Sequence, residues 1–252
     1  MAMDLGIDGR VALVLGASKG IGRGIAEGLA REGARVALAS RSRERLETAV
    51  AEVDGETAAF EADTGDLERI AALPNEVAES LGPVEILVTN TGGPPMGEAL
   101  DAGLDDWRKA YESLVLAPRV LAEAVVPGMR ERGWGRIVNV GSSSTEEPIP
   151  GLTLSNAHRP ALIGFFKTLA REVAADGVTV NDIATGRFAT DRLAANWGGR
   201  EEMERGAPAD VPAGRLGTPA EYGDLVAFLA SERAGYITGV SIPIDGGLLR
   251  SV

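Results

Sequence analysis

The sequence of 252 residues contains no cysteine and a single histidine, His158. Disulfide bonds and cysteine-ligated metals are therefore excluded, and we predict no metal site, because one histidine cannot form a histidine-rich one. Aromatic residues make up only 4% of the chain, whereas 44% is apolar and 33 residues are glycine. This composition is typical of helices that pack closely on a sheet, and the length suits one large α/β core.

The chain is also short of positive charge. It has 25 Lys and Arg residues against 37 Asp and Glu residues, a formal net charge of −12. Because phosphate contact needs clustered Lys and Arg, we expect neither nucleic acid nor an anionic membrane surface as a partner. No apolar run reaches the ~20 residues that a membrane-spanning helix requires. The N-terminus lacks a secretory signal pattern, and the sequence predicts a cytoplasmic protein.

Strand and helix signals alternate from one end of the chain to the other, with no internal repeat and no linker of low complexity. Parallel neighbouring strands need crossover connections, so this alternation predicts a doubly wound parallel α/β sheet of about seven strands with helices on both faces. We expect a single domain over 1–252. The predicted strands are 11–15, 35–39, 58–61, 85–89, 136–140, 178–183 and 240–244, and the predicted helices are 21–31, 43–53, 67–81, 104–132, 154–175 and 220–230.

Glycines separate the first predicted strand from the first predicted helix, in the sequence Gly16-Ala-Ser-Lys-Gly20-Ile-Gly22. Glycine lets the backbone turn sharply and approach a pyrophosphate, and a helix N-terminus offers free N–H groups and the positive end of its dipole. Glycine turns also serve purely structural packing. The strand before and the helix after favour dinucleotide binding in a Rossmann-type fold.

The end of the second predicted strand carries no carboxylate. NAD-binding units usually place an acidic side chain there for the ribose hydroxyls, whereas this chain has Ser40 and Arg41, with Lys19 in the glycine loop. Two cations suit a 2′-phosphate, so we expect NADP(H) in preference to NAD(H). The alternative is that Arg41 merely opens a solvated helix.

The polar segment 188–212 breaks the alternation. It is either a loose surface excursion or a substrate lid, and its place after the sixth strand favours the lid, because ligands of such sheets bind at that edge. Phe188, Leu193 and Trp197 within it suggest a partly apolar substrate pocket.

Nearly the whole chain resembles the short-chain dehydrogenase/reductase family. Gly16, Gly20 and Gly22 match its three-glycine pattern. Segments 89–92, 138–142 and 180–186 fall where the family has its Asn-Asn-Ala-Gly, catalytic-serine and Pro-Gly segments, and 214–219 and 238–247 complete the likeness.

The resemblance implies a set of cofactor contacts, in which Asp63 would lie beside the adenine and Thr190 would meet the nicotinamide amide or the phosphates. The expected cofactor-binding residues are Gly16, Ser18, Lys19, Gly20, Ile21, Gly22, Ser40, Arg41, Asp63, Thr64, Asn90, Gly92, Gly186, Phe188 and Thr190.

The chain departs from the family at three of its four catalytic positions. Ser142 is kept, but Ser155 stands in place of the tyrosine, Arg159 in place of the lysine, and Leu114 in place of the asparagine that holds a relay water. The sequence of residues 154–159, Leu-Ser-Asn-Ala-His-Arg, resembles a divergent, oxoacyl-carrier-protein-reductase-like branch of the family. In this branch Ser-Asn-x-x-Arg replaces the usual motif with tyrosine and lysine. The expected catalytic residues are therefore Ser142, Ser155 and Arg159.

These replacements change where a proton could come from. Arg159 could stabilise negative charge on a substrate oxygen, but a guanidinium does not release its proton near neutral pH. Ser155 is far less acidic than a phenol of pKa ~10, so it would orient the substrate. The simplest donor is water entering through the region of the missing asparagine. His158, one turn from Ser155, could be an acid or serve a structural or interface role, and Ser143 and Ser144 could extend a hydroxyl chain or simply form a turn.

Three functions fit the sequence. The first is an NADP-dependent oxidoreductase acting on a small carbonyl or alcohol substrate through Ser142, Ser155 and Arg159. The second is a catalytically silent NADP(H)-binding sensor or partner subunit. The third, a non-redox enzyme, is disfavoured by the retained glycine loop. The family also implies a homodimer or homotetramer through the helices at about 104–132 and 154–175.

Overall fold

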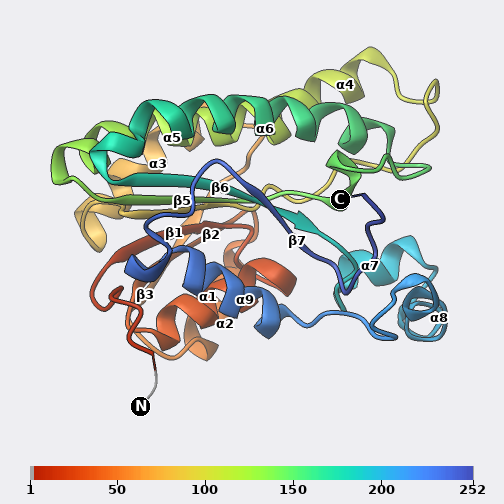
Figure 1. Cartoon of the computed structure of the whole chain (residues 1–252), viewed down its shortest axis with the longest axis horizontal. Coiled ribbons are helices and arrows are strands. Elements are labelled where there is room, and N and C mark those ends of the chain that lie inside the picture. The colour runs from red at the N-terminus through yellow and green to blue at the C-terminus, as the bar shows by residue number, and fades with distance from the viewer. Residues whose placement is uncertain (1–2, 252) are drawn as a thin grey trace.

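Seven parallel strands form one sheet in the order β3-β2-β1-β4-β5-β6-β7, with helices on both faces (Figure 1). This order confirms the predicted doubly wound sheet. The computed structural model describes residues 3–251. The strands are β1 Val11–Leu15, β2 Arg35–Ser40, β3 Thr57–Glu61, β4 Ile86–Thr89, β5 Gly135–Val140, β6 Val178–Thr185 and β7 Ser241–Ile244.

The sheet separates two hydrophobic cores. All five residues of β1 are buried, because alternate side chains of a strand point to opposite faces and both faces of this strand are covered. Ala12 and Val14 belong to one core, and Val11, Leu13 and Leu15 belong to the other. The short apolar run that predicts β1 thus lies in the centre of the molecule.

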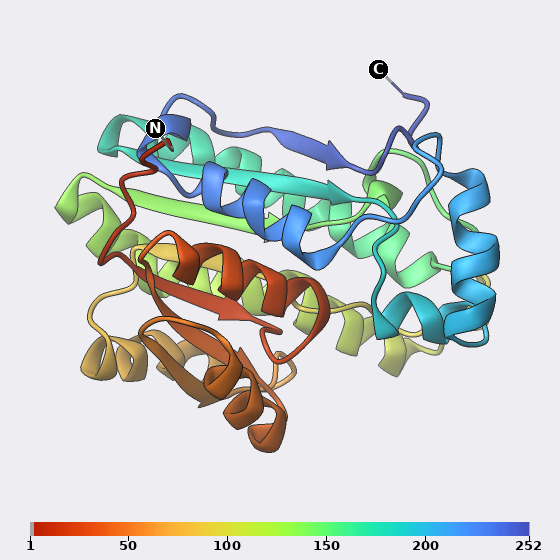
Figure 2. The ribbon, with the colours of Figure 1, turned by 90° about the horizontal axis from the view of Figure 1, so that it is seen from below.

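Two groups of helices cover the two faces of the sheet (Figures 1 and 2). One core contains residues of α1, α2 and α9, and the other contains residues of α3, α5 and α6. The longer helices are α1 Gly20–Arg31, α2 Arg43–Glu52, α3 Leu67–Ser80, α4 Leu104–Tyr111, α5 Ala117–Arg132, α6 Thr153–Val173 and α9 Pro219–Leu229.

Helices α1 and α9 approach backbone to backbone, as the pair of helices in front of the sheet in Figure 2 illustrates. A Cβ atom added to Gly24 would lie 2.2 Å from the carbonyl oxygen of Pro219, and one added to Gly223 would lie 2.2 Å from the carbonyl oxygen of Gly24. Only glycine permits this approach, which fixes the helix that follows the glycine loop.

Two helical predictions need correction. The stretch 104–132 is not one α-helix, since the π-helical segment Glu112–Leu116 separates α4 from α5. The stretch 154–175 is α6 followed by a 3₁₀ turn, Ala174–Asp176.

Segment 188–212 contains two short helices, α7 Asp191–Asn196 and α8 Arg200–Gly206, and a 3₁₀ turn, Ala207–Asp210. It is therefore not a loose excursion.

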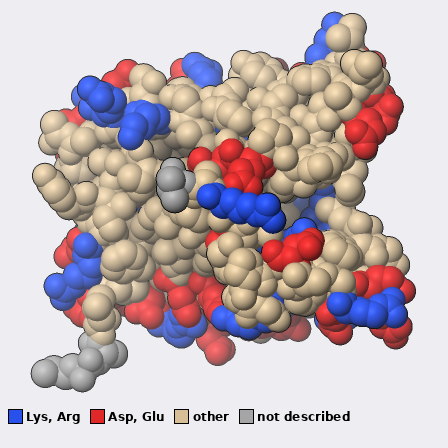
Figure 3. Space-filling model, turned by 45° about the vertical axis from the view of Figure 1, so that its right-hand side comes forward, with Lys and Arg blue, Asp and Glu red and all other residues tan. Residues whose placement is uncertain are grey.

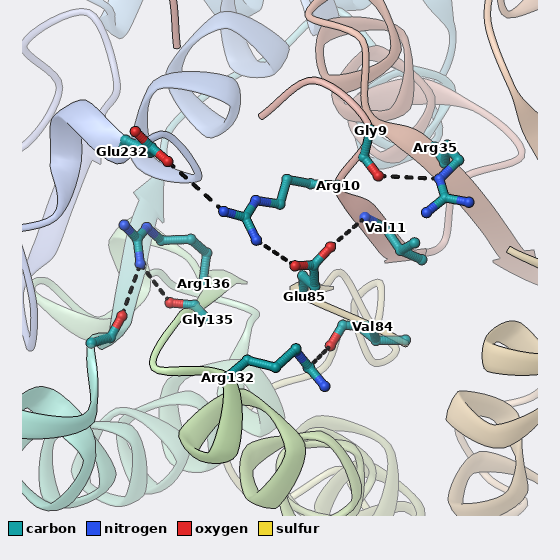
Figure 4. A network of polar contacts seen from close by, with 11 residues as sticks. Gly9, Arg10, Val11, Arg35, Val84, Glu85, Arg132, Gly135, Arg136 and Glu232 are labelled. Atoms are coloured by element: carbon teal, nitrogen blue, oxygen red, sulfur yellow. Dashed lines mark hydrogen bonds and ion pairs between the residues drawn. The ribbon is translucent and has the colours of Figure 1, made fainter. Parts of the chain in front are cut away.

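Ion pairs and hydrogen bonds connect the amino ends of the central strands (Figure 4), and a tryptophan stacks on two of the arginines. Arg10 contacts Glu85 and Glu232, and its guanidinium lies 4.0 Å from the ring centre of Trp134. Arg136 lies over the same ring at 4.4 Å. Burial, together with repulsion from Arg10, lowers the pKa of Arg136 to about 10. This cluster stabilises the sheet at the end opposite the glycine loop.

Acidic and basic side chains lie interspersed over the face shown in Figure 3, with no single basic patch on it. Among residues 3–251, no helix combines the length and the apolar character needed to span a bilayer.

Candidate active site

The predicted site residues gather at the carboxyl edge of the sheet. The glycine loop follows β1, Ser40 ends β2, Asp63 follows β3, and Asn90 follows β4. Ser142 follows β5 and Gly186 follows β6. In open parallel sheets ligands bind outside this edge, where the strand order reverses, and here β1 and β4 flank that switch point. Helices α4, α7 and α8 lie at the same side of the molecule (Figure 1).

The glycine loop has the backbone that a diphosphate needs. Gly16 and Gly20 adopt positive φ angles of 61° and 56°. A Cβ atom at Gly22 would lie 2.2 Å from the carbonyl oxygen of Gly16 and 2.6 Å from Asn90 Nδ2. Lys19 is the N-cap of α1 and makes no side-chain capping hydrogen bond. The first N–H groups of α1 are thus without a side-chain cap, as at helix ends that bind phosphate.

The end of β2 offers a hydroxyl group to a ligand. Ser40 Oγ is buried and has no hydrogen-bond partner among the described residues, a situation that buried polar atoms rarely tolerate. Arg41 beside it is exposed. Lys19 points elsewhere, because its Nζ lies 3.6 Å from Asp191 at the start of α7. Ser40 and Arg41 therefore fit a ribose phosphate, whereas Lys19 joins the glycine loop to segment 188–212.

Other expected cofactor contacts lie around the same edge. Asp63 is exposed and accepts a hydrogen bond from Gly65 N, with Thr64 between them. Gly92 has a φ of 78°, and a Cβ atom there would meet nothing within 4 Å. Gly186 packs closely on Asp245, because a Cβ atom added to Gly186 would lie 2.5 Å from Cα of Asp245. Gly92 thus faces open space, while Gly186 needs its small size for packing.

Two further loop positions, Ser18 and Ile21, lie at the start of α1 and are half-buried. Ile21 packs against the core beneath the loop, and Gly20 faces segment 188–212. A Cβ atom at Gly20 would lie 3.4 Å from Cγ2 of Thr190. The hydroxyl of Thr190 caps α7 by accepting from Leu193 N at 3.2 Å. Segment 188–212 therefore begins next to the glycine loop.

The apolar residues of segment 188–212 make most of their contacts within the protein, and the partly apolar substrate pocket stays a prediction. Phe188 is 4% exposed and packs edge-on against Tyr222 with ring centres 5.1 Å apart, so only its main chain could meet a cofactor. Leu193 and Trp197 pack on a small cluster of Ala194, Met203 and Ala207. Segment 188–212 thus has a core of its own, because its short helices need apolar contacts to persist.

Arg159 connects three parts of the site. Its Nε donates to Ser155 Oγ at 3.1 Å, its Nη1 to Val140 O at 3.0 Å, and its Nη2 to Gly92 O at 2.6 Å. It thereby joins α6 to the end of β5 and to the loop after β4. A guanidinium has five N–H donors, so two remain after these three bonds. These two donors are the strongest candidates to hold a substrate oxygen.

A chain of hydroxyl groups continues from Arg159. Ser155 Oγ lies 3.2 Å from Ser144 Oγ, and both side chains are buried. Ser142 Oγ instead accepts from Ser144 N at 3.1 Å and caps a 3₁₀ turn, Ser143–Thr145. The structure thus brings Ser155 and Arg159 into direct contact and adds Ser144, while Ser142 joins them only through the backbone.

A buried carboxylate lies behind Arg159, and sequence reasoning missed it. Asp182 on β6 is 3% exposed and accepts hydrogen bonds from Asn139 Nδ2 at 2.6 Å and Ser241 Oγ at 2.7 Å. Asn139 in turn accepts from Thr89 Oγ1 at 2.8 Å. Burial raises the pKa of Asp182, opposed by those two hydrogen bonds and by Arg159. A charged residue inside the predicted strand 178–183 was the available signal.

The charge of Arg159 is balanced by opposing neighbours. Burial lowers its pKa, the Asp182 carboxylate raises it, and the guanidinium of Arg192 lowers it again. The side chain stays a cation at neutral pH, because a guanidinium does not lose its proton in proteins. It can therefore attract a developing oxyanion but cannot release a proton to it.

The position of Leu114, where water was expected to enter, is packed with apolar side chains, which makes it an unfavourable path for water. Leu114 lies in the π-helical segment, is 2% exposed, and packs with Ala110, Val115 and Leu154. This apolar cluster closes the position where the resembling family holds a relay water. The exposed surface at Gly92, directly below the guanidinium, is the open approach for solvent.

His158 occupies a structural position. Its ring lies 5.0 Å from that of Trp107 and 6.1 Å from that of Tyr111, and its Nδ1 lies 2.7 Å from Leu154 O. It is buried in these contacts and shares no hydrogen bond with Ser155. The structural alternative is therefore favoured over an acid role.

No tyrosine takes the place of the missing phenol. Tyr111 stacks beside His158, and Tyr236 is fully exposed. Tyr222 is fully buried beneath the sheet, where its hydroxyl lies 2.8 Å from Thr185 Oγ1. Burial raises the pKa of Tyr222 above its ordinary value, which makes it a weaker acid still.

Comparison with known proteins places this site in a family. The family described as Enoyl-(Acyl carrier protein) reductase matches residues 16–249. The 3-oxoacyl-(acyl-carrier-protein) reductase FabG of Haemophilus influenzae is 35% identical over 245 residues, which cover 97% of this chain and 100% of that protein.

Solved structures agree with the sequence comparison. An L-sorbose reductase from Gluconobacter frateurii, in complex with NADPH and L-sorbose, superposes with a TM-score of 0.94 at 33% identity and covers 99% of this chain and 100% of its own. A variant of the actinorhodin polyketide ketoreductase with NADPH gives a TM-score of 0.92 at 32% identity, with 100% of both chains covered.

Proposed function

The chain belongs to the short-chain dehydrogenase/reductase family of NAD(P)-dependent oxidoreductases, and we propose that it is an NADP(H)-dependent enzyme that interconverts a small carbonyl compound and its alcohol at a Ser155–Arg159 site. The hydrogen bond between Ser155 and Arg159 beside the glycine loop carries this proposal. The motif Ser-Asn-x-x-Arg, in place of Tyr-x-x-x-Lys, marks the divergent branch to which we assign the chain.

When bound, the nicotinamide would supply or accept the hydride, and the protein residues would hold the substrate oxygen. Arg159 directs its two remaining N–H donors at the substrate oxygen and stabilises the negative charge that develops there, as preorganised donors do in other enzymes. Ser155, fixed by Ser144 and by Arg159, orients the same oxygen. The proton comes from solvent at the exposed Gly92 surface, since no phenol or histidine faces the site.

We propose that the residues at the end of β2 make the protein prefer NADP(H) to NAD(H). The buried and unpaired hydroxyl of Ser40 and the exposed guanidinium of Arg41 suit a 2′-phosphate, and no carboxylate stands there to hold a free ribose. The NADPH complexes of the two similar reductases agree with this choice. The predicted residues of the glycine loop, Asp63, Asn90, Gly92 and Thr190 would bind the rest of the cofactor.

The proposal includes a homodimer or homotetramer formed through α4, α5 and α6. Leu104 on α4 is 75% exposed and Tyr111 is 45% exposed, and apolar side chains at such exposure suit a subunit contact. Sedimentation or light scattering tests this, and a monomer at micromolar concentration would contradict it.

A cofactor-binding protein without turnover is the second candidate, because none of the three tyrosines takes the place of the missing acid. One experiment separates the two. Purified protein is mixed with NADPH or NADH and a panel of ketones and oxo acids, and the absorbance of the reduced cofactor is followed. Turnover with NADPH supports the enzyme, and tight NADPH binding with no consumption supports the silent protein.

Two variants on the same helix refine the test. Arg159→Ala removes the guanidinium from the site, whereas Arg171→Ala removes an exposed one elsewhere on α6. The proposal expects loss of turnover in the first variant and wild-type turnover in the second. Equal activity in both would exclude Arg159 from the chemistry.

A further inference from the structure

A second arginine contacts the same loop as Arg159, the loop after β4. Arg192 belongs to α7, and its Nη2 donates to Pro94 O at 2.7 Å. Its guanidinium rests against Gly93, where an added Cβ atom would lie 2.8 Å from Nη2. Glycine at position 93 thus leaves the space that the guanidinium occupies, and the contact holds the side chain against the loop after β4.

The two guanidinium groups bind carbonyl oxygens two residues apart, Arg159 on Gly92 and Arg192 on Pro94. They come from different helices, α6 and α7, and meet at one stretch of backbone, of which Gly92 and Gly93 are exposed and Pro94 is buried. The charge of Arg192 contributes to lowering the pKa of Arg159, whereas the Asp182 carboxylate raises it. A second anion placed between the two guanidinium groups would reduce their mutual repulsion.

Neither group has a carboxylate partner. Other arginines near this edge are paired: Arg187 with Asp210 at 2.8 Å, Arg200 with Asp191 at 3.5 Å, and Arg215 with Glu221 at 2.6 Å. No carboxylate oxygen among residues 3–251 lies within 4.0 Å of the guanidinium of Arg159 or Arg192. Arg192 is exposed, with donors beyond its one bond to Pro94.

Arg192 lies close to both the glycine loop and the proposed substrate oxygen. Thr190 and Asp191, just before it, lie against the glycine loop at Gly20 and Lys19. Arg159, which would hold the substrate oxygen, binds Gly92 O, two residues from the carbonyl that Arg192 binds. Arg192 is therefore within reach of the part of a substrate next to the reacting oxygen, and the KM for NADPH distinguishes this role from a contact with the cofactor phosphates.

We propose that Arg192 binds a carboxylate of the substrate, so that the enzyme reduces oxo acids to hydroxy acids in preference to neutral ketones. This rests on the proposed function and specifies its substrate class. The carbonyl oxygen meets Arg159 and Ser155, while the carboxylate meets Arg192 and is unchanged by the reaction. Hydride adds to the carbonyl carbon, and a solvent proton joins the oxygen.

The test compares matched pairs of substrates. Simple 2-oxo, 3-oxo and 4-oxo carboxylates and their methyl esters are each reduced with NADPH by the wild-type protein, Arg192→Met, Arg192→Lys and the control Arg205→Met. Arg205 is exposed in the same segment and contacts only Glu202, at 3.7 Å. We expect the wild type to prefer at least one acid over its ester.

In Arg192→Met, kcat/KM for that acid falls about 10- to 100-fold, the loss expected for one or two charged hydrogen bonds, mainly through KM. The value for the ester and the KM for NADPH stay the same. Arg192→Lys retains part of the preference, and Arg205→Met retains all of it. Equal use of acids and esters by the wild type, an equal loss for both in Arg192→Met, or a higher KM for NADPH would each overturn the inference.

A binding measurement keeps the inference testable if nothing is reduced. Saturation-transfer NMR follows the same acids and esters on protein loaded with NADP. Binding of an acid that is lost in Arg192→Met supports the carboxylate site even without turnover, in which case only the proposed reaction fails. No acid binding, or equal binding by both proteins, contradicts the site itself.

Discussion

Replacing Arg159 with lysine tests whether the geometry of a guanidinium, and not merely its charge, makes the site work. Arg159→Lys keeps a cation at the position where the family has one. The arginine donates to Ser155, Val140 and Gly92, which lie on three separate elements. The single ammonium of a shorter lysine side chain cannot bind all three acceptors and still hold a substrate oxygen.

The expected loss follows from the contacts. Each charged hydrogen bond is worth about 1.5–3 kcal/mol, and at least two of the three should be lost, although water at the exposed Gly92 carbonyl replaces part of that. The rate depends mainly on the N–H donor that stabilises the developing oxyanion, and losing one such donor lowers kcat by about 10²–10³. We therefore expect kcat to fall by about 10²–10³, with NADPH binding unchanged.

The assay follows NADPH oxidation at saturating substrate, with cofactor binding measured separately by fluorescence titration. Arg171→Lys, an exposed change on the same helix, is the matched control. Circular dichroism and thermal unfolding show whether the variant keeps its fold. A well-folded Arg159→Lys protein with nearly wild-type kcat would refute the reasoning, since charge alone would then suffice.

Three further changes test other parts of the site. Gly22→Ala places a Cβ atom 2.2 Å from Gly16 O, so NADPH binding should weaken by at least about tenfold, while an unchanged dissociation constant would contradict the loop's role. Arg41→Ala should raise the KM for NADPH and leave that for NADH unchanged, and equal effects on both would exclude a phosphate contact. Asp182→Asn tests the buried carboxylate: because burial raises its pKa in the folded state above the ordinary value of 3.8, the charged form opposes folding. The variant should therefore unfold at higher temperature than the wild type at neutral pH, and this difference should shrink as the pH falls toward 4. A difference in unfolding temperature that grows as the pH falls would contradict this prediction.

The sequence was sufficient to predict the sheet, the glycine loop and the carboxyl edge as the site. Each depends on short-range pattern: apolar runs form buried strands such as β1, and glycines between a strand and a helix make the turn at Gly16. The parallel order follows from the alternation, since crossover connections leave few other arrangements.

Side-chain partners between distant segments were beyond sequence reasoning. Leu114 marks a lost asparagine in the sequence, but only the structure reveals that apolar side chains such as Leu154 fill the space around it. His158 looks like an available acid until its ring is found beside Trp107. Arg192 lies 98 residues from Pro94 in the chain, so nothing local connects it with Arg159. Pattern determines elements, whereas the site depends on contacts that form only after the chain folds.

The most direct test is a single-turnover reaction with NADPH deuterated at the transferable position and an excess of oxo acid, with the product examined by mass spectrometry. Direct hydride transfer at the Ser155–Arg159 site predicts one deuterium on the carbinol carbon of a hydroxy acid, and loss of this product in Arg159→Ala. Bound cofactor that stays reduced with every substrate, or a labelled product formed equally well by Arg159→Ala, would contradict it.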